Sequence, residues 1–229
     1  MFDRLWCFQD PVPRSGSLNM AFDELMLEFA AMEHAPVLRT YSWSEPFVSI
    51  GYFDRIDAIE ARFPGRPLVR RWTGGGAVDH RADFTFSLAI PVEHLLARRP
   101  GEQRYREIHG AVASALNRCG VPSRAAGRGI VPIRAGTPAP CFEAVVCGDL
   151  ISGERKIVGG AQRRTRLGVL HQGSIQLPGP PLKWSALSHA LASAFAPEII
   201  TLPCDSGRMT RAAALAESKY ASPAWLQAR

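Results

Sequence analysis

The chain has 229 residues, of which 46% are hydrophobic and 21% are charged. This is the make-up of a soluble globular protein with a single domain over residues 1–229, and it excludes a disordered or collagen-like chain. No apolar run approaches the roughly 18 residues that a membrane span needs, and residues 1–14 lack the basic start and apolar segment of a signal peptide. We therefore expect a cytoplasmic protein with no membrane partner.

Charge and cysteine usage narrow the class of partner and site. The 27 Lys and Arg residues exceed the 21 Asp and Glu residues, which gives a net charge of +6 that is spread along the chain. This balance favours an acidic partner, either a protein or a nucleic acid. The 5 cysteines form no CxxC pair and have no histidines at zinc-ligand spacing, so we expect neither a disulfide scaffold nor a metal site.

The first third of the chain predicts a helix followed by strands. Apolar residues recur at helical spacing over 18–32, with Ser17 as the candidate N-cap. The runs 37–43 and 47–53 are rich in β-branched and aromatic residues, and the short break between them predicts that they pair with each other. A short helix is expected over residues 55–62.

The middle of the chain predicts two strands around a glycine-rich turn, then a second helix. The strands are expected at 67–72 and 84–91, so the glycines between them lie in a strand-to-strand loop. Apolar spacing predicts a helix over 101–119, and Gly120 followed by Pro122 supplies its stop signal.

The last part of the chain mixes strands and helices without a regular alternation. Residues 122–140 read as a loop with at most one short strand, and residues 144–177 as a meander of short strands. The last 45 residues are expected to be mainly helical, with a break around 203–207. The pattern predicts a mixed α+β domain rather than a doubly wound sheet.

The motif RRWTGGGAVDH at residues 70–80 is the first candidate for chemistry. Three consecutive glycines let backbone amides approach a ligand, and Arg70 and Arg71 can supply charge for a carboxylate or phosphate. The motif is neither a P-loop nor a dinucleotide-binding GxGxxG sequence. A flexible hairpin loop is the alternative explanation when the motif is taken alone.

The motif GERKIVGGAQRR at residues 153–164 is the second candidate. Lys156 lies in a predicted strand, three residues before a Gly-Gly pair, where a cation can polarise an acyl carbonyl while backbone also comes close. An exposed lysine beside a tight bend is the alternative.

A cysteine and two histidines complete the candidates. Cys141 lies at the end of the Pro/Gly-rich segment, and a loop thiol brought near Lys156 can shift toward the thiolate and accept an acyl group. An inert cysteine is the alternative. Cys147 is expected to lie in a core strand, whereas His80 and His171 are the histidines placed to face a cleft.

Taken together, the motifs resemble the lipoate-protein ligase and octanoyl transferase family. The resemblance rests on LRTYSWSEPFVSIGYF, RRWTGGGAVDH followed by FTFSLAIP, GERKIVGGAQRR and VLHQGSI, in this order and at this spacing. The helix containing Asn19 and Asp23 and the C-terminal KYASPAW fit as well, so the resemblance covers nearly the whole chain. It implies the biotin and lipoate ligase catalytic-domain fold, a mixed β-sheet flanked by helices and related to class II aminoacyl-tRNA synthetases.

The resemblance also implies an acyl tunnel between the TGGG loop and the KIVGGA strand. Lys156 is expected next to the acyl carbonyl, Cys141 is expected to be the second catalytic residue, and Val78 and Phe86 are expected in the tunnel wall. The substrate-binding residues implied are Arg71, Thr73, Gly74, Gly75, Gly76, Ala77, His80, Gly159, Gly160 and Ala161.

Two branches of the family remain open. Cys141, Phe142 and Glu143 look like the CF(D/E) element of cysteine-dependent octanoyl transferases, which need no ATP because their donor thioester is already activated, and this is the branch we favour. The glycines at 74–76 are closer to the ATP-dependent ligases, and the chain departs from the transferase pattern at Gly160, at Arg81 and in the order His171-Gln172. A ligase would require ATP and Mg²⁺, together with an accessory domain for which this chain has no room and which a separate chain would supply.

The favoured branch implies a covalent mechanism with two protein partners. Cys141 would take an octanoyl group from acyl carrier protein and pass it to a lysine of a lipoyl domain, such as the glycine-cleavage H protein or a 2-oxoacid dehydrogenase E2. No cofactor is expected. A nucleic-acid-binding module is a remote alternative, because the arginine clusters lack interleaved stacking aromatics.

Overall fold

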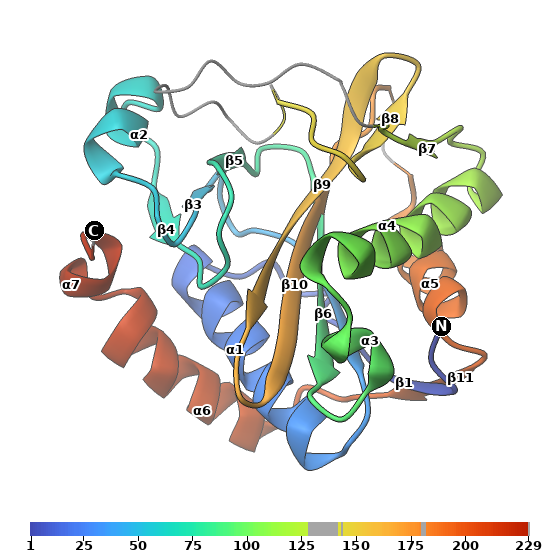
Figure 1. Ribbon diagram of the computed structural model, residues 1–229. Coiled ribbons are helices and arrows are strands. Elements are labelled where there is room, and N and C mark those ends of the chain that lie inside the picture. The colour runs from blue at the N-terminus through green and yellow to red at the C-terminus, as the bar shows by residue number, and fades with distance from the viewer. Residues whose placement is uncertain (128–141, 143, 180–181, 229) are drawn as a thin grey trace.

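The computed structural model describes residues 1–127, 142, 144–179 and 182–228 (Figure 1). Within this part of the chain, a large mixed sheet has the strand order β11-β1-β2-β6-β10-β9-β8-β7. Its strands are β1 (Arg4–Gln9), β2 (Val37–Tyr41), β6 (Phe84–Pro91), β7 (Arg124–Ala125), β8 (Leu150–Ser152), β9 (Arg155–Arg164), β10 (Gly168–Ile175) and β11 (Glu198–Thr201). β1 runs parallel to β2 and β11, and the other neighbouring pairs are antiparallel.

A small second sheet carries the segments around the glycine-rich motif. It consists of β3 (Val48–Ile50), β4 (Leu68–Arg70) and β5 (Val78–Asp79), with β3 in the centre. The loop between β4 and β5 contains the three consecutive glycines. The small sheet therefore holds this loop beside the long strands β9 and β10 (Figure 1).

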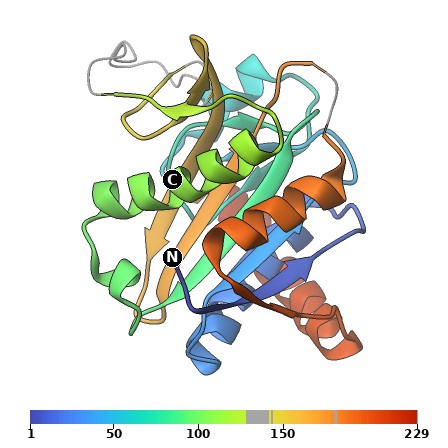
Figure 2. The same ribbon diagram turned by 90° about the vertical axis from the view of Figure 1, so that its right-hand side faces the viewer.

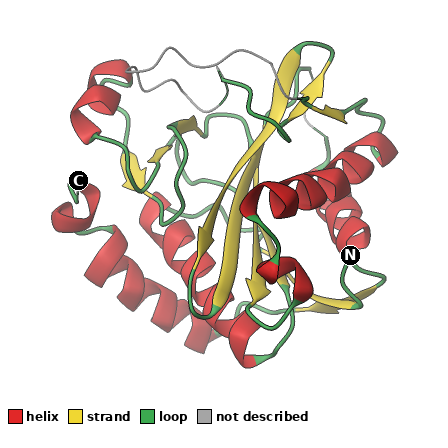
Figure 3. Ribbon diagram, in the orientation of Figure 1, coloured by secondary structure: helices red, strands yellow, loops and turns green. Residues whose placement is uncertain are grey.

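Helices cover both faces of the large sheet. The α-helices are α1 (Gly16–Met32), α2 (Ile56–Arg62), α3 (Leu95–Arg98), α4 (Gly101–Arg118), α5 (Trp184–Phe195), α6 (Ser206–Leu215) and α7 (Pro223–Leu226), and a π-helical turn, η1 (Ala216–Tyr220), follows α6. α4 and α5 lie on one face, and α1 and α6 lie on the other (Figures 2 and 3). The α+β class predicted from the sequence, a mixed sheet flanked by helices, is confirmed. None of the helices in the described part of the chain combines the length and hydropathy of a membrane span.

Strand β6 shows how the sequence separates the two faces of the sheet. Successive strand side chains point to opposite faces. Phe86 and Leu88 pack with residues of α4 and α5, whereas Ala89 packs with residues of α1. Ser87, on the α1 face, donates a hydrogen bond to Asp23 of α1 at 2.7 Å. The face toward α4 and α5 also has buried polar contacts, such as that between Ser188 and Thr40 at 3.0 Å, so both faces combine apolar packing with buried hydrogen bonds.

Helix α1 begins earlier than its apolar spacing predicts. Ser15, not Ser17, is the N-cap, and its hydroxyl accepts a hydrogen bond from the Leu18 amide at 3.4 Å. The first helical residue is Gly16, where a Cβ atom would come within 2.9 Å of both Phe47 and Val69. The start of the helix therefore depends on close packing against the segment of the small sheet. The spacing of apolar residues within the helix gives no information about this packing.

The predicted hairpin between residues 37–43 and 47–53 is wrong. β2 pairs with β1 and β6, so both of its edges are occupied within the large sheet. β3 instead pairs with β4 and β5 in the small sheet. The short connection favoured a hairpin locally, but long-range pairing decided the arrangement.

Three details of the C-terminal half also differ from expectation. Residues 168–175 form one strand of 8 residues, longer than the short strands expected for the meander over 144–177. Residues 198–201 form β11 within the largely helical tail, because they pair in parallel with β1. Cys147 lies in a turn and is partly exposed, so its expected place in a core strand is wrong.

Candidate functional site

A pocket lies between the two sheets and α1. Its walls are Met20, Tyr41, Trp43, Ser49, Arg71, Val78, His80, Thr85, Gly159, Gly160, Ala161, Gln172, Gly173 and Ser174. A second pocket shares Gly160 and Ala161 with the first and is also lined by Gly74, Gly75 and Cys147. The two glycine motifs of the sequence are thus brought to one place in the fold.

Several predicted binding residues line these pockets, and others are buried next to the residues that line them. Arg71, His80 and the glycine pair of β9 lie in the wall of the first pocket, as does Val78. Phe86 does not line it, because its ring packs on the other face of the sheet against Gly173, where a Cβ atom would come within 2.3 Å of the ring. The expectation of Phe86 in the tunnel wall is therefore wrong.

The glycine loop is held by the buried guanidinium of Arg71. Arg71 donates to the carbonyl oxygen of Gly74 at 2.6 Å and to that of Gly76 at 2.8 Å. Gly75 has a φ of 82°, which favours glycine, and its carbonyl oxygen would lie 1.8 Å from a Cβ atom at Gly51. Arg71 thus fixes the conformation of the loop by binding two of its carbonyl oxygens. The sequence had predicted a different role for Arg71, contact with a carboxylate or phosphate of the ligand.

The loop is also tied to the opposite side of the pocket by a buried chain of hydrogen bonds. Thr73 donates to Gln172 Oε1 at 2.7 Å, and Gln172 Nε2 donates to Asp23 at 2.7 Å. Ala77, the last residue of the loop, is buried in the apolar cluster of the small sheet. Thr73 and Ala77 are therefore better described as anchors of the loop than as groups that touch a ligand.

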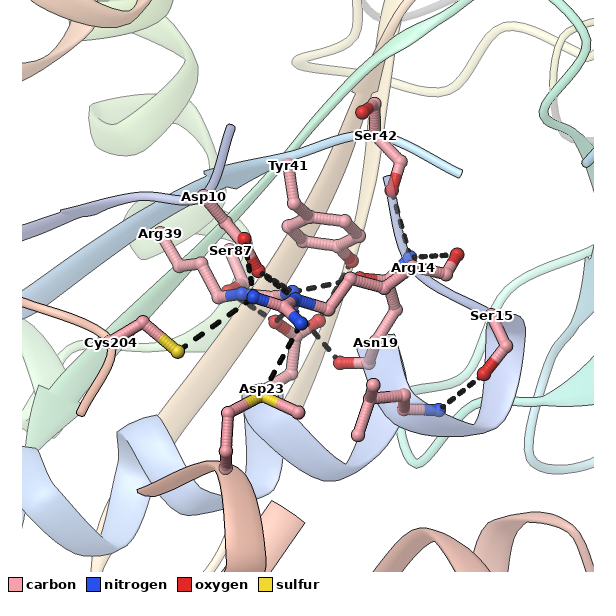
Figure 4. Close-up of polar contacts among 12 residues, drawn as sticks. Asp10, Arg14, Ser15, Asn19, Asp23, Arg39, Tyr41, Ser42, Ser87 and Cys204 are labelled. Atoms are coloured by element: carbon pink, nitrogen blue, oxygen red, sulfur yellow. Dashed lines mark hydrogen bonds and ion pairs between the residues drawn. The ribbon is translucent and has the colours of Figure 1, made fainter. Parts of the chain in front are cut away.

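Asp23 is the centre of this buried network (Figure 4). It accepts hydrogen bonds from Arg39 at 3.0 Å, from Ser87 at 2.7 Å and from Tyr41 at 2.8 Å. Arg39 also pairs with Asp10 at 2.9 Å, so its buried charge has two carboxylate partners. Burial and the neighbouring Asp23 raise the pKa of Tyr41 well above its ordinary value, which keeps this phenol protonated as a donor.

Two departures from the family pattern, Gly160 and His171, are in close contact in the structure. A Cβ atom at Gly160 would lie 2.7 Å from His171 Nε2 and 3.0 Å from His109 Nε2. Antiparallel pairing sets Gly173 opposite Gly160, which places His171 diagonally across from it. A serine at position 160 has no room while His171 is present. His171 does not line either of these pockets, so its expected place facing the cleft is wrong.

Lys156 makes a buried ion pair instead of lining the first pocket. Its ammonium lies 2.7 Å from Asp149 Oδ2 and donates to the Ala144 carbonyl at 2.9 Å. Asp149 also accepts a hydrogen bond from Tyr105 at 2.5 Å. The sequence analysis missed Asp149, whose only signal is its place in a Cys-Gly-Asp turn shortly before the lysine strand.

The surroundings of Lys156 include the residue that follows the candidate nucleophile. Cys141 lies outside the described residues. The ring centroid of Phe142 is 5.4 Å from Lys156 Nζ, and both residues line a third pocket together with Asp79 and Arg81. Phe142, the residue that follows Cys141 in the sequence, therefore lies beside Lys156.

Ser49 is a further residue that the sequence analysis missed. Its hydroxyl lies 2.8 Å from His80 Nε2, and His80 Nδ1 lies 2.7 Å from Asp83 Oδ2. The His80 ring is stacked on Trp43 with a centroid distance of 3.9 Å. A serine in a short strand carries no signal by itself, because only the pairing of β3 with β5 brings it to the histidine.

Comparison with solved structures defines the class of the domain. The crystal structure of lipoate-protein ligase A bound with ATP is similar over 99% of both chains, with a TM-score of 0.75 and 22% identity. A bipartite lipoate protein ligase from Thermoplasma acidophilum is similar over 99% of this chain and 96% of that one, with a TM-score of 0.66 and 20% identity. The fold is that of a lipoate ligase catalytic domain.

Comparison with protein families and curated proteins identifies the family. Residues 15–196 match the lipoyl protein ligase A/B catalytic domain, and the chain belongs to this family. The octanoyltransferase LipM of Oceanobacillus iheyensis is 34% identical over 75% of this chain and 64% of its own length. The octanoyltransferase LipM of Symbiobacterium thermophilum is 31% identical over 96% of this chain and 97% of its own length. The octanoyltransferase LipM of Moorella thermoacetica is 37% identical over 69% of this chain and 60% of its own length. The matched part thus spans less than two thirds of the first and third of these proteins.

Proposed function

We propose that the protein transfers an octanoyl group from a thioester donor to a lysine side chain of a lipoyl domain. The observation that carries the proposal is the similarity, at 31–37% identity, to proteins named octanoyltransferase LipM. The pocket supports it, because it lies where two glycine motifs leave backbone without side chains.

The character of the pocket walls suits an unbranched alkyl chain. Met20, Tyr41, Trp43 and Val78 present carbon surface, and their burial of an apolar ligand is favourable by about 25 cal/mol per Å² removed from water. The polar groups of the wall are already bonded to protein partners, as Gln172 is to Thr73 and Asp23. A chain without polar atoms leaves these bonds intact.

The proposed chemistry uses Cys141 as nucleophile and Lys156 as the positive charge beside it. The Cys141 thiolate attacks the carbonyl carbon of the octanoyl thioester, a C–S bond forms, and the donor leaves as a thiol after taking up a proton. The acceptor amine then attacks the new thioester, forms an amide and returns the thiol to Cys141. Lys156 stabilises the negative charge on oxygen in both steps, and Asp149 holds its ammonium in place.

The net charge of the protein and the lysine acceptor of the proposed reaction indicate the two protein partners. We propose acyl carrier protein as donor and a lipoyl domain, of the H protein or E2 type, as acceptor. Both are typically acidic, so the net charge of +6 favours encounter. The Thermoplasma acidophilum ligase was solved as part of a lipoylation system with its E2 lipoyl domain.

Mass spectrometry of an acyl-enzyme tests this function. Incubation with octanoyl-acyl carrier protein, without ATP, is expected to give an octanoyl adduct that hydroxylamine removes and that a lipoyl domain accepts. Cys141→Ala abolishes the adduct and the transfer, whereas Cys204→Ala, which removes an exposed thiol far from Lys156 in sequence, leaves both. Lys156→Met lowers the rate of adduct formation by about 10²- to 10³-fold, as for loss of one oxyanion donor.

An ATP-dependent ligase is the second candidate. The likeness of the fold to lipoate-protein ligases and the three glycines at 74–76 are the observations that favour it. It would need ATP and Mg²⁺, and the transferase needs no cofactor. If the protein forms no adduct from the thioester but activates lipoate once ATP and Mg²⁺ are added, the ligase is correct and the transferase is wrong.

A further inference from the structure

A chain of hydrogen bonds joins a serine, a histidine and an aspartate at the wall of the first pocket. Ser49 Oγ lies 2.8 Å from His80 Nε2, and His80 Nδ1 lies 2.7 Å from Asp83 Oδ2. Ser49 and His80 both line the pocket, whereas the side chain of Asp83 is fully buried behind them. The three residues come from β3, from the end of β5 and from the turn before β6.

The surrounding donors fix the direction of each hydrogen bond. Arg71 Nη1 donates to Ser49 Oγ at 3.1 Å, and when His80 carries its proton at Nδ1, facing Asp83, its Nε2 accepts from the Ser49 hydroxyl. Thr85 and Ser174 donate to the same Asp83 oxygen that faces His80 Nδ1. We assign the His80 tautomer protonated at Nδ1 from these contacts, because Asp83 Oδ2 is then the acceptor for all three donors.

This is the geometry of an activated nucleophile. A serine bonded to the free nitrogen of an imidazole, whose other nitrogen is held by a carboxylate, can lose its proton to the ring as it attacks a carbonyl. The Arg71 guanidinium, at hydrogen-bond distance, favours the alkoxide that forms. Stacking on Trp43 at 3.9 Å holds the ring in place. The arrangement uses neither Cys141 nor Lys156.

We propose that Ser49, His80 and Asp83 form a second acyl-accepting site, which hydrolyses short and medium-chain acyl thioesters and esters that enter the pocket. Ser49 Oγ attacks the acyl carbonyl carbon, an ester bond forms, and the bond to the thiol or alcohol breaks. His80 takes the serine proton and delivers it to the leaving group. Water, deprotonated by His80, then attacks the ester, which releases the carboxylic acid and returns the proton to Ser49.

This activity goes beyond the proposed octanoyl transfer and has a different outcome for the substrate. Transfer keeps the acyl group on protein, whereas hydrolysis discards it. The walls around Ser49 suit short and medium-chain acyl groups, because Trp43 and Val78 are their apolar neighbours.

The test uses the full chain with Cys141→Ala, so that the proposed thioester route is absent and position 141 offers no hydroxyl to the probe. An alkyl fluorophosphonate probe is added, and the intact mass and the labelled peptide are measured. The expected result is one phosphonyl group on the peptide that contains Ser49, with release of fluoride. Hydrolysis of p-nitrophenyl butyrate and octanoate is followed on the same protein.

Variants made in this background distinguish the loss of the proposed site from the loss of any buried hydroxyl. Ser49→Ala is expected to abolish the label, and His80→Gln to lower hydrolysis by about 10²- to 10⁴-fold, as for loss of a general base. Ser188→Ala removes another buried serine hydroxyl, bonded to Thr40 at 3.0 Å, and is expected to change neither readout.

Each outcome decides the proposal. A label mapped elsewhere, or hydrolysis that survives Ser49→Ala in a folded protein, overturns it. Should Ser49→Ala fail to fold, the mapped peptide of the protein that retains Ser49 is decisive, because absence of label there also overturns the site. Octanoyl transfer by the wild-type chain is measured in parallel, so that failure of the transferase function and failure of the serine site are seen separately.

Discussion

The ammonium group of Lys156 lies 2.7 Å from a carboxylate oxygen of Asp149, and both side chains are buried. Removal of one member of a buried pair leaves an uncompensated charge, which costs about 3–5 kcal/mol. We therefore expect Asp149→Asn to lower the free energy of unfolding by that amount in urea denaturation. The exposed pair of Arg99 and Glu107, at 3.1 Å, is the matched control.

The same pair gives a double-mutant cycle. Lys156→Met combined with Asp149→Asn removes both charges, so the loss of stability in the double variant is expected to be smaller than the sum of the single losses. Glu107→Gln is expected to change the free energy of unfolding by about 0–1 kcal/mol, as for exposed pairs. Additive losses at Lys156 and Asp149 would show that the two side chains do not interact.

The anchoring of the glycine loop can be tested at Thr73. Its hydroxyl donates to Gln172 Oε1 at 2.7 Å, and both groups are buried. Thr73→Val keeps the shape but leaves Gln172 without this donor, which is expected to cost about 1–3 kcal/mol in urea denaturation. If the loop also positions the acyl donor, KM for the octanoyl donor rises while the fold is retained.

An exposed hydroxyl supplies the comparison for Thr73. Ser218 donates to the carbonyl oxygen of Ala214 at the surface. Ser218→Ala is expected to change the free energy of unfolding by less than about 0.5 kcal/mol. Equal effects of the two substitutions would mean that the buried bond to Gln172 has no special importance.

The close contact between Gly160 and His171 predicts a coupled pair of substitutions. Gly160→Ser inserts atoms within 2.7 Å of His171 Nε2, so we expect a loss of stability of about 1–3 kcal/mol, as for overpacking. His171→Ala leaves a cavity, and the serine partly fills it in the double variant. Thermal unfolding of the two single variants and the double variant checks this, and an additive double variant would contradict it.

Local signals predicted most of the elements but not how strands combine. Apolar spacing was sufficient to locate α1 and α4, apart from the first residues of α1, since helix hydrogen bonds lie within the segment. It failed for residues 37–43 and 47–53, because pairing with distant strands placed β2 and β3 in different sheets. The family resemblance predicted the fold correctly because it rests on motifs that are far apart in the chain.

The site was predicted in part for the same reason. The glycine motifs can be recognised in the sequence as places where backbone can come close to a ligand. Arg71, His80 and Gly160, which belong to these motifs, do line the pocket. Asp149 and Ser49 were missed, because each acquires its partner only through folding: the carboxylate meets Lys156 across a turn, and the serine meets His80 across β3 and β5. Neither contact has a sequence pattern of its own.

Two buried histidines predict how stability depends on pH. Burial lowers the pKa of His109 to about 4 and that of His171 well below its ordinary value, so both are neutral in the folded protein. In the unfolded chain a histidine has a pKa of about 6.5, so the unfolded state binds protons first as the pH falls. The stability contributed by neutral His109 is therefore fully present above about pH 6.5 and is lost progressively between about pH 6.5 and 4.

Urea denaturation at pH 7 and pH 5 measures this loss, and a His109 variant isolates the share of one histidine. We expect His109→Gln to reduce the difference in unfolding free energy between the two pH values, because glutamine takes up no proton. The exposed His34, with a side chain 71% exposed, provides His34→Gln as a control that leaves the difference unchanged. If both variants show the wild-type difference, titration of His109 does not contribute to the acid sensitivity of the fold.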